Sequence, residues 1–347
     1  MRAALLLFLL VYIALAASPI RLEVDAVLVS PINTTKVIDY IKAAREAIYM
    51  EVYVFTYRPL AEALAEAAGR GVDVYVVLSS RVYGGVPQQA RDIAAYLEGR
   101  GVKVRWNGDF PNVHTKLYVI DNKTVIIGNI NPTASGFHRN RGVMLVIHNA
   151  TLARQLAAVV LNDFRGRYPR YNYPGVLISP INSQDGLLHI LSQPGALYVA
   201  MEQIYMDSGL VPYFLNRPAY IVAARTDADI GAAIDDRLVA KIIVVGNQLY
   251  VGSINLGYYS IQRNREVGLL IENPQLARRL EALILQWHRE AGGTTQTTQA
   301  GAAETAPTEG RWELLFWLAV FILAALIAVY VNRPRGAGRR GRAGGRG

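Results

Sequence analysis

Three kinds of polar side chain recur at short spacing in the first half of the chain. His114 and Lys116 are two residues apart, so on an extended strand both side chains point to the same face. After a turn at Asp121, Asn129 and Asn131 repeat this spacing on the returning segment. An imidazole can attack phosphorus or transfer a proton, an ammonium can hold non-bridging oxygens, and an amide can orient them. This combination suits chemistry on a tetrahedral phosphate.

The order of these residues resembles the signature H-x-K-x4-D followed by G-[SN]-x-N, which belongs to the phospholipase D superfamily. The matching positions are His114, Lys116, Asp121, Gly128, Asn129 and Asn131. The resemblance implies a metal-independent phosphodiesterase without a cofactor, in which one histidine attacks phosphorus to give a phosphohistidine and a second protonates the leaving oxygen. It makes His114 the nucleophile, with Lys116, Asp121 and Asn131 completing the catalytic set. Asp121 looks more structural than catalytic, because it lies in the turn at the far end of the strand.

An internal repeat covers most of the chain between its two ends. Three segments recur in the same order: VLVSPIN (27–33) as VLISPIN (176–182), GNIN (128–131) as GSIN (252–255), and RNRGVMLVI (139–147) as RNREVGLLI (263–271). Three ordered matches indicate a duplication. We therefore expect two pseudo-symmetric repeats, residues 22–165 with the intact motif and residues 173–290 with a degenerate one, packed across one cleft.

The second repeat keeps the groups that would hold a phosphate but lacks the histidine. Val239 stands where the histidine is expected, and Gly246 stands where the aspartate is expected. The resemblance implies a set of phosphate-binding residues drawn from both repeats: Asn129, Lys241, Ser253 and Asn255. Loss of a general acid typically costs about 10² to 10⁴ in rate. His138 follows the first motif closely enough to be considered as a substitute.

The carboxylates are divided unevenly between the repeats. Members of the family usually carry an acidic residue downstream of the histidine that orients the imidazole. At this place the first repeat has Gly142 and the second has Glu266. Glu266 is thus a possible partner of the His114 imidazole across the pseudo-twofold axis, or else a surface carboxylate paired with a flanking arginine. The sequence leaves both interpretations open.

The elements around the motif alternate between strands and helices. This alternation predicts an α/β fold with a largely parallel sheet. The resemblance implies two phospholipase D-like sandwich repeats, each a mixed sheet flanked by helices. In the first repeat we expect strands at 47–55, 72–80 and 102–106, amphipathic helices at 60–71 and 88–101, and a hairpin of 113–120 with 124–131.

Both ends of the chain are apolar. Residues 1–17 have the layout of a secretory signal peptide, with an uncleaved anchor as the alternative. Residues 313–331 are long and apolar enough to cross a membrane as a helix. A Thr/Gly/Ala-rich stalk (292–310) precedes this span, and an Arg/Gly-rich tail (332–347) follows it, which favours a cytoplasmic C-terminus. The pattern predicts a single-pass protein of the cell membrane with its catalytic body outside the cell.

Charge and composition narrow the classes of function. The absence of cysteine excludes disulfides, thiolate metal sites and cysteine nucleophiles. Of the net charge of +9, seven arginines at the two extremes account for seven charges, which leaves 9 − 7 = +2 for the rest. Such a near-neutral body lacks the broad basic surface expected of a nuclease. Many Val, Ile, Tyr and Arg residues without cysteine suggest a thermophilic prokaryote.

The function predicted from these features is a membrane-anchored phosphodiesterase. It would act outside the cell on phospholipid or another phosphodiester, through a phosphohistidine on His114. One alternative is a catalytically impaired relative that binds phosphorylated ligands at the cell surface, for which Val239 is the main support. A second alternative is a nuclease, so nucleic acid is a less favoured partner. The oligomeric state is open.

Overall fold

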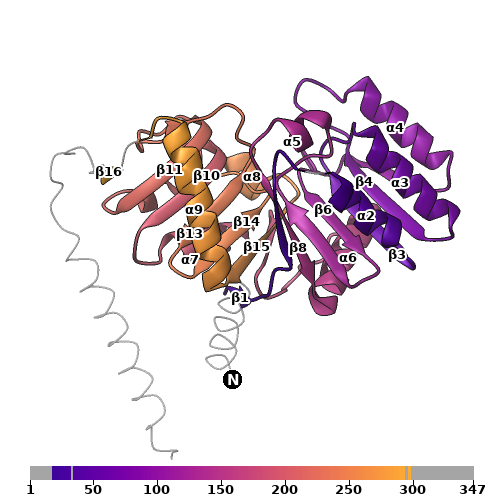
Figure 1. The fold of residues 1–347 in the computed structure, drawn as a ribbon, viewed down its shortest axis with the longest axis horizontal. Coiled ribbons are helices and arrows are strands. Elements are labelled where there is room, and N and C mark those ends of the chain that lie inside the picture. Colours follow the sequence, from indigo (N-terminus) through magenta and orange to yellow (C-terminus); the bar gives the residue numbers. More distant parts are fainter. Residues whose placement is uncertain (1–17, 33, 294–295, 298–347) are drawn as a thin grey trace, which may run out of the picture. The chain divides into compact units, whose positions relative to one another are not determined.

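The computed structural model describes residues 18–32, 34–293 and 296–297, which form two β-sheets with helices packed on them (Figure 1). The expected signal peptide (1–17), membrane span (313–331) and tail (332–347) lie outside the described residues, and so does most of the stalk. Within the described part of the chain, no helix is long and apolar enough to cross a membrane.

The first sheet has the strand order β2-β8-β7-β6-β3-β4-β5. Neighbours among β3, β4 and β5 are parallel, whereas the other neighbours are antiparallel. The expectation of a largely parallel sheet is therefore wrong, because short turns such as the one between β6 and β7 can only join antiparallel strands. The bounds are β2 (Ala26–Val29), β3 (Ala47–Val52), β4 (Asp73–Ser79), β5 (Lys103–Asn107), β6 (Lys116–Ile120), β7 (Thr124–Gly128) and β8 (Val143–His148).

The second sheet repeats this order. Its path is β1-β15-β14-β13-β10-β11-β12, with β9 paired to β15 and β16 paired to β11. The run β9-β15-β14-β13-β10-β11 corresponds strand for strand to β2-β8-β7-β6-β3-β4, as expected for a duplicated sequence. The bounds are β1 (Ile20–Arg21), β9 (Val176–Ser179), β10 (Leu197–Ile204), β11 (Pro218–Thr226), β12 (Ala233–Ile234), β13 (Lys241–Val245), β14 (Gln248–Gly252), β15 (Glu266–Glu272) and β16 (Gln296–Thr297).

Helices cover both faces of the first sheet. Apolar side chains of α2, α3 and α4 pack on one face, and those of α6 pack on the other. In the second repeat α7 and α9 take the places of α2 and α6. Two short 3₁₀ turns between β10 and β11 stand in place of α3, and the described residues between β11 and β12 form no helix in place of α4. The bounds are α2 (Thr35–Ala43), α3 (Arg58–Gly69), α4 (Gln88–Glu98), α5 (Ala134–His138), α6 (Ala150–Phe164), α7 (Ser183–Leu191), α8 (Tyr258–Gln262), α9 (Pro274–Glu290), η1 (Met206–Ser208) and η2 (Val211–Phe214).

One apolar core joins the two repeats. Along β6, Leu117 and Val119 point into this shared core, whereas Tyr118 points to the separate core under α2, α3 and α4, as the two-residue period of a strand requires. Ile242 of β13 lies in the same shared core. The repeats therefore belong to a single compact unit, and the cleft between them has walls that are fixed relative to each other.

Candidate active site

His114 lies just before strand β6, where the chain leaves its own sheet. Val113 forms an isolated parallel bridge with Arg265 of the second repeat, and the His114 N–H donates to the Arg265 carbonyl over 2.8 Å. The predicted strand 113–120 therefore begins later, at Lys116. The correction has a physical reason, since residues before Lys116 find their backbone partners in the other repeat. As a result, His114 is held by both halves of the molecule.

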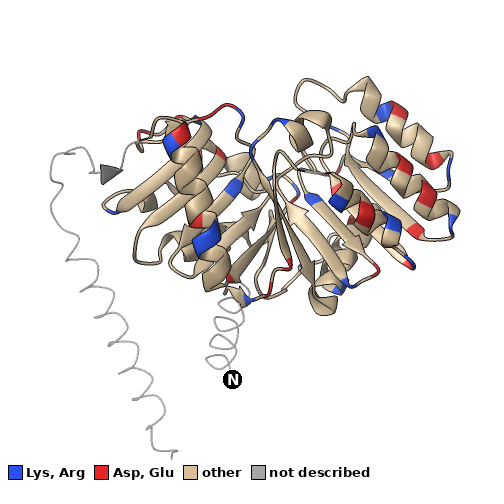
Figure 2. Cartoon of the chain, viewed as in Figure 1, with Lys and Arg blue, Asp and Glu red and all other residues tan. Residues whose placement is uncertain are grey.

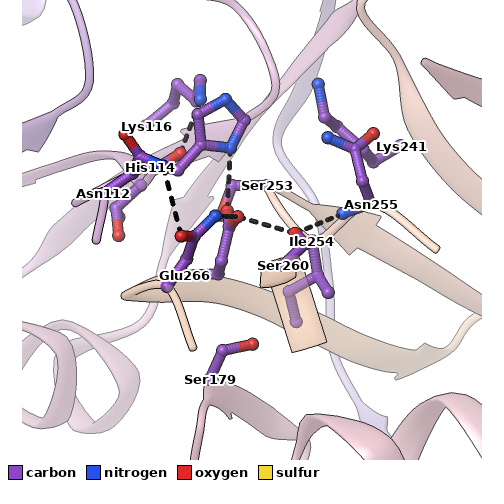
Figure 3. A network of polar contacts seen from close by, with 12 residues as sticks. Asn112, His114, Lys116, Ser179, Lys241, Ser253, Ile254, Asn255, Ser260 and Glu266 are labelled. Carbon is purple, nitrogen blue, oxygen red and sulfur yellow. Dashed lines mark hydrogen bonds and ion pairs between the residues drawn. The ribbon is translucent and has the colours of Figure 1, made fainter. Parts of the chain in front are cut away.

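The His114 imidazole is paired with the carboxylate of the second repeat. Its Nδ1 lies 2.9 Å from Glu266 Oε2 (Figure 3). The other carboxylate oxygen accepts hydrogen bonds from Ser260 Oγ at 2.6 Å and Asn264 Nδ2 at 3.3 Å. Of the two interpretations that the sequence left open, the structure places Glu266 against His114, fully buried, and not on the surface.

The protonation of this pair follows from its surroundings. Burial by itself would raise the pKa of Glu266, but the His114 charge and hydrogen bond, together with Lys116, lower it overall. Burial lowers the pKa of His114, and Lys116 adds to this effect, while Glu266 opposes it. At neutral pH the carboxylate is therefore ionised and the imidazole neutral. An ionised Glu266 accepts the Nδ1 proton, which leaves Nε2 with a free lone pair, the state that a nucleophile needs.

A buried ion pair fixes the segment that carries Glu266. The guanidinium of Arg265 binds Asp163, at the end of α6 in the first repeat, over 2.5 and 2.7 Å. Both side chains are almost completely buried. Glu51 is also fully buried here, and its pKa is raised well above the ordinary value by burial and by the charge of Asp163. This ion pair crosses between the repeats directly beside Glu266, so it sets where the carboxylate stands relative to His114.

The two motif lysines have the same local geometry. Lys116 Nζ donates to the His114 carbonyl at 2.5 Å, and Lys241 Nζ donates to the Val239 carbonyl at 2.8 Å. Burial and then the charge of Lys241 lower the pKa of Lys116 well below its usual range, so the two cations act on each other. In Figure 3 they lie on opposite sides of the His114 ring. Two converging ammonium groups suit the non-bridging oxygens of a phosphodiester.

The polar residues after the hairpins divide into two kinds. Asn129 Oδ1 accepts from the Val143 N–H at 2.7 Å, and Ser253 Oγ accepts from the Val267 N–H at 3.1 Å. Both side chains are buried, and Ser253 Oγ also donates to the Val267 carbonyl at 3.2 Å. The neighbouring strand therefore uses both the donor and the acceptor of this hydroxyl, which corrects the expectation that Ser253 holds phosphate. Asn255 lines the cleft.

Two side-chain amides after the first hairpin each keep an unpaired atom. Asn129 Nδ2 and Asn131 Oδ1 are buried and have no hydrogen-bond partner among the described residues. The Asn255 side chain accepts from the Gln203 N–H at 3.1 Å, which leaves its amide nitrogen to act as a donor. The amide nitrogens of Asn129 and Asn255 thus remain as donors that could orient a bound phosphate, whereas Asn131 Oδ1 can only accept a hydrogen bond.

Asp121 does not reach the cleft. It lies after the far end of β6 and accepts backbone N–H bonds of 2.7 to 3.1 Å from Arg45, Glu46 and Ala47. Its place in a catalytic set is thereby corrected, since its carboxylate caps the segment that leads into β3. The corresponding turn of the second repeat is one residue shorter, and Gly246, also at positive φ, stands in the position of Asp121, so this carboxylate is absent there.

A cleft of about 700 Å³ opens above the paired residues. Its walls include His114, Glu202, Asn255 and Glu266, together with aromatic side chains from both repeats: Tyr53, Tyr83, Tyr205, Tyr258 and Tyr259. His114 is the one histidine among the residues that line it. His138, considered as a substitute, is exposed on α5 and packs against Tyr57. In the described ranges no group of three or more acidic or histidine side chains could hold a metal ion.

Comparisons with known proteins agree with this geometry. The family model described as cardiolipin synthase, PLD-like domain, matches residues 37–164. A phospholipase D of Rickettsia bellii is 33% identical over 136 residues, 38% of this chain and 65% of the relative. A phospholipase D of Rickettsia conorii is 30% identical over 145 residues, 41% of this chain and 70% of the relative. The chain belongs to the phospholipase D superfamily.

This phospholipase D-like chain spans about two thirds of the length of these curated relatives, and the family model matches its first repeat. A solved structure, the phosphatidylserine synthase of Haemophilus influenzae, covers more. It superposes with a TM-score of 0.54 over 90% of this chain and 97% of its own, at 13% identity. At that identity the likeness shows the fold alone, and it covers both repeats.

The second half-site of this phospholipase D-like chain has lost its histidine and its carboxylate together. We call His114 with Glu266 the first half-site, and Val239 with Gly142 the second. A Cβ on Gly142 would lie 3.0 Å from Val239 Cγ2, so these residues face each other as His114 and Glu266 do. The backbones also correspond, because the Val239 N–H donates to the Arg141 carbonyl over 2.8 Å. The second half-site therefore lacks both the histidine and the carboxylate, while its backbone keeps the arrangement of the first.

Sequence reasoning missed several residues that contact the two half-sites. Ser260, Asp163 and Glu202 were not considered. Ser260 could have been found by aligning GNINPTASG with GSINLGYYS, because the repeat that lacks the carboxylate also has Gly136 in place of the serine. Asp163 and Glu202 had no such signal. They lie far from the motif in sequence and reach the site through α6 and β10.

Proposed function

We propose that this chain is a phosphodiesterase whose nucleophile is His114 Nε2. The observation that carries the proposal is the His114–Glu266 pair, in which a buried ionised carboxylate fixes the tautomer of a neutral imidazole. A pair of this kind both orients the ring and stabilises the positive charge that it gains on attacking phosphorus. Lys116 and Lys241 supply the positive charge for the non-bridging oxygens.

The reaction runs in two steps. Nε2 attacks phosphorus, the bond to the leaving oxygen breaks, and a phosphohistidine forms while the Nδ1 proton stays shared with Glu266. Water then attacks the phosphorus, the bond between phosphorus and Nε2 breaks, and the neutral imidazole is restored. Because Val239 replaces the second histidine, the leaving oxygen receives no proton from an imidazole in the first step. We therefore expect a strong preference for leaving groups of low pKa.

The proposed substrate is a phospholipid or another small phosphodiester outside the cell. Lys and Arg alternate with Asp and Glu along the ribbon, with no broad basic stretch in the view of Figure 2. Tyr83, Tyr258 and Tyr259 line the cleft with exposed rings, which suits an amphipathic substrate. The proposal includes two predictions from the sequence. The signal peptide (1–17) would direct the protein across a prokaryotic cell membrane, and the membrane span (313–331) would anchor it there with the cleft outside.

A second function is favoured by the second half-site. With Val239 facing Gly142, the chain could bind phosphorylated ligands through its lysines and turn them over very slowly. In that case catalysis would be limited by the absent proton-transfer group. Adding an imidazole through Val239→His would then raise turnover by a large factor.

The experiment compares hydrolysis by the full chain in detergent with that by two variants, His114→Ala and Val239→His. The substrates are bis(p-nitrophenyl) phosphate, a short-chain phosphatidylcholine in mixed micelles, and single-stranded DNA. The proposal predicts turnover of the chromogenic diester that is lost in His114→Ala, and faster hydrolysis of phosphatidylcholine than of DNA. Equal rates for wild type and His114→Ala would overturn it. No turnover by wild type, with turnover gained in Val239→His, would favour the binding function.

A further inference from the structure

The proposed reaction leaves one proton without an acceptor. When water attacks the phosphohistidine, the water must give up a proton. In a two-histidine site the second histidine takes this proton, but here Val239 stands at its position. Several ionisable side chains line the cleft in the described chain. Glu266 already holds His114, and Asp207 binds the Tyr258 N–H at 3.0 Å. Glu202 is the carboxylate that faces the second half-site.

Strand register places Glu202 beside the absent histidine. In the first sheet Lys116 is paired with Val52, and in the second sheet Lys241 is paired with Met201. The residue after each of these partners is Tyr53 in the first repeat and Glu202 in the second. The centroid of the Tyr53 ring lies 4.7 Å from that of His114. Glu202 therefore occupies the position in the second repeat that Tyr53 occupies in the first, and it lies beside Val239 as Tyr53 lies beside His114.

Direct contacts confirm this placement. Glu202 Oε2 forms a short ion pair with Lys241 Nζ, and the Glu202 N–H donates to the Ala240 carbonyl over 2.8 Å. The other carboxylate oxygen lies 3.4 Å from Arg225 Nη2. The side chain is 19% exposed and lines the cleft, so it is open to solvent on the substrate side. A water molecule that enters the cleft has access to this carboxylate.

The cations around Glu202 keep its carboxylate ionised. Burial acts to raise its pKa, but the charges of Lys241, His114 and Lys116 outweigh this and lower the pKa to about 2. The group is therefore ionised at neutral pH. The influence of His114 and Lys116, both from the first repeat, also indicates that the carboxylate lies within electrostatic reach of the nucleophile across the cleft.

We propose that Glu202 is the general base that activates water for hydrolysis of phosphorylated His114, in place of the second histidine. The inference rests on the proposed function. In the step, the water oxygen bonds to phosphorus, the bond between phosphorus and Nε2 breaks with its electron pair returning to Nε2, and the proton of the water passes to a Glu202 oxygen. The product phosphate leaves, and Glu202 then releases the proton to solvent.

A purely structural role for Glu202 makes a different prediction. If the carboxylate only neutralises Lys241, its loss disturbs phosphate binding and slows both chemical steps together. If it is the base, its loss slows the second step and leaves the first nearly intact. The two roles are separated by following the first released leaving group apart from steady-state turnover.

The experiment uses the full chain in detergent with bis(p-nitrophenyl) phosphate, whose good leaving group makes the first step fast. In Glu202→Gln we expect a burst of one p-nitrophenolate per active site, followed by steady-state turnover about 10² to 10⁴ slower than wild type. In Glu202→Ala, added formate should restore the steady state without changing the burst. Glu62→Gln, an exposed carboxylate of α3, is the matched control and should behave as wild type.

Two outcomes overturn the inference, and they are distinct from failure of the proposed function. Loss of the burst in parallel with the steady state in Glu202→Gln, in protein that unfolds at the wild-type temperature, shows a binding role. Steady-state turnover in Glu202→Gln equal to that of wild type shows no role. Absence of both burst and turnover in wild type would instead remove the proposed function, and the role of Glu202 with it.

Discussion

The first half-site pairs His114 with a buried carboxylate, whereas the second pairs Val239 with a glycine. Both stand on the same backbone, since each residue donates its N–H over 2.8 Å to the carbonyl of an arginine in the opposite repeat. Each site also keeps its lysine, bonded to the carbonyl two residues earlier. The comparison shows that the fold can keep the lysines of a half-site while it lacks the histidine and the carboxylate that transfer protons.

The unequal half-sites also explain why the damaged motif is compatible with chemistry. A nucleophile needs its own carboxylate, and that carboxylate comes from the opposite repeat. Loss of Glu266 would therefore damage the first half-site, whereas loss of a carboxylate at position 142 affects only the second. Because histidine and carboxylate are both absent from the second half-site, the first stays complete.

The largest expected effect comes from breaking the intact pair. We predict that Glu266→Gln lowers kcat/KM by about 10³ to 10⁴, because the imidazole loses the acceptor that fixes its tautomer. The fall of kcat/KM at acid pH reports the pKa of His114, because the imidazole is active only when it is neutral. Since Glu266 raises the pKa of His114, its removal should lower that pKa and move this fall to lower pH. An unchanged fall in the pH dependence of kcat/KM would argue against a direct pair.

The next effect is on the unfolding free energy and comes from the ion pairs formed by the arginine next to each half-site. Asp163→Asn leaves Arg265 buried and unpaired, so we expect a loss of about 3 to 5 kcal/mol in unfolding free energy. Asp235→Asn is the matched variant, because Asp235 lies 3.1 Å from Arg141 beside Gly142. Arg141 keeps a second partner, Glu290, so a smaller loss is expected. Urea unfolding of both variants tests this order, and equal losses would contradict it.

The lysines test whether the second half-site still serves the reaction. We predict that Lys116→Met and Lys241→Met each lower kcat/KM by about 10² to 10³, since each removes one charged donor to the phosphate. Measurements of kcat and KM for both variants provide the comparison. If Lys241→Met were as active as wild type, the second half-site would be a structural remnant.

The smallest expected effect is on the stability of the folded protein and comes from Glu51. Its counterpart in the second repeat, by strand register, is Ala200. Burial raises the pKa of Glu51, so above pH 4.5 the unfolded chain loses its proton while the folded chain keeps it. This group therefore lowers stability progressively as the pH rises above that value. Glu51→Gln should remove the trend and be more stable than wild type at pH 8, but not at pH 4. Thermal unfolding at both values checks the sign.

Much of the site followed from local sequence, and the remainder depended on long-range contacts. The two-residue spacing of His114 and Lys116 and the ordered repeats singled out His114, both lysines and Glu266 as candidate site residues. The nucleophile role of His114 came from the family resemblance, and the partner of Glu266 was left open. The tertiary pairing of Val113 with Arg265 could not be predicted, and it moved the start of β6 to Lys116. Ser253 was misassigned because spacing alone does not reveal that the Val267 backbone already uses both the donor and the acceptor of its hydroxyl.

The central claim is that the intact half-site forms a covalent intermediate on His114. Wild-type protein should be mixed with bis(p-nitrophenyl) phosphate, quenched within the first turnover and digested at alkaline pH, where phosphohistidine survives. Mass spectrometry of the peptide that contains His114 then reports the modification. The account predicts a phosphoryl ester on His114 that is absent from His114→Asn. Turnover without modification of His114, or with the ester on another residue, would contradict it.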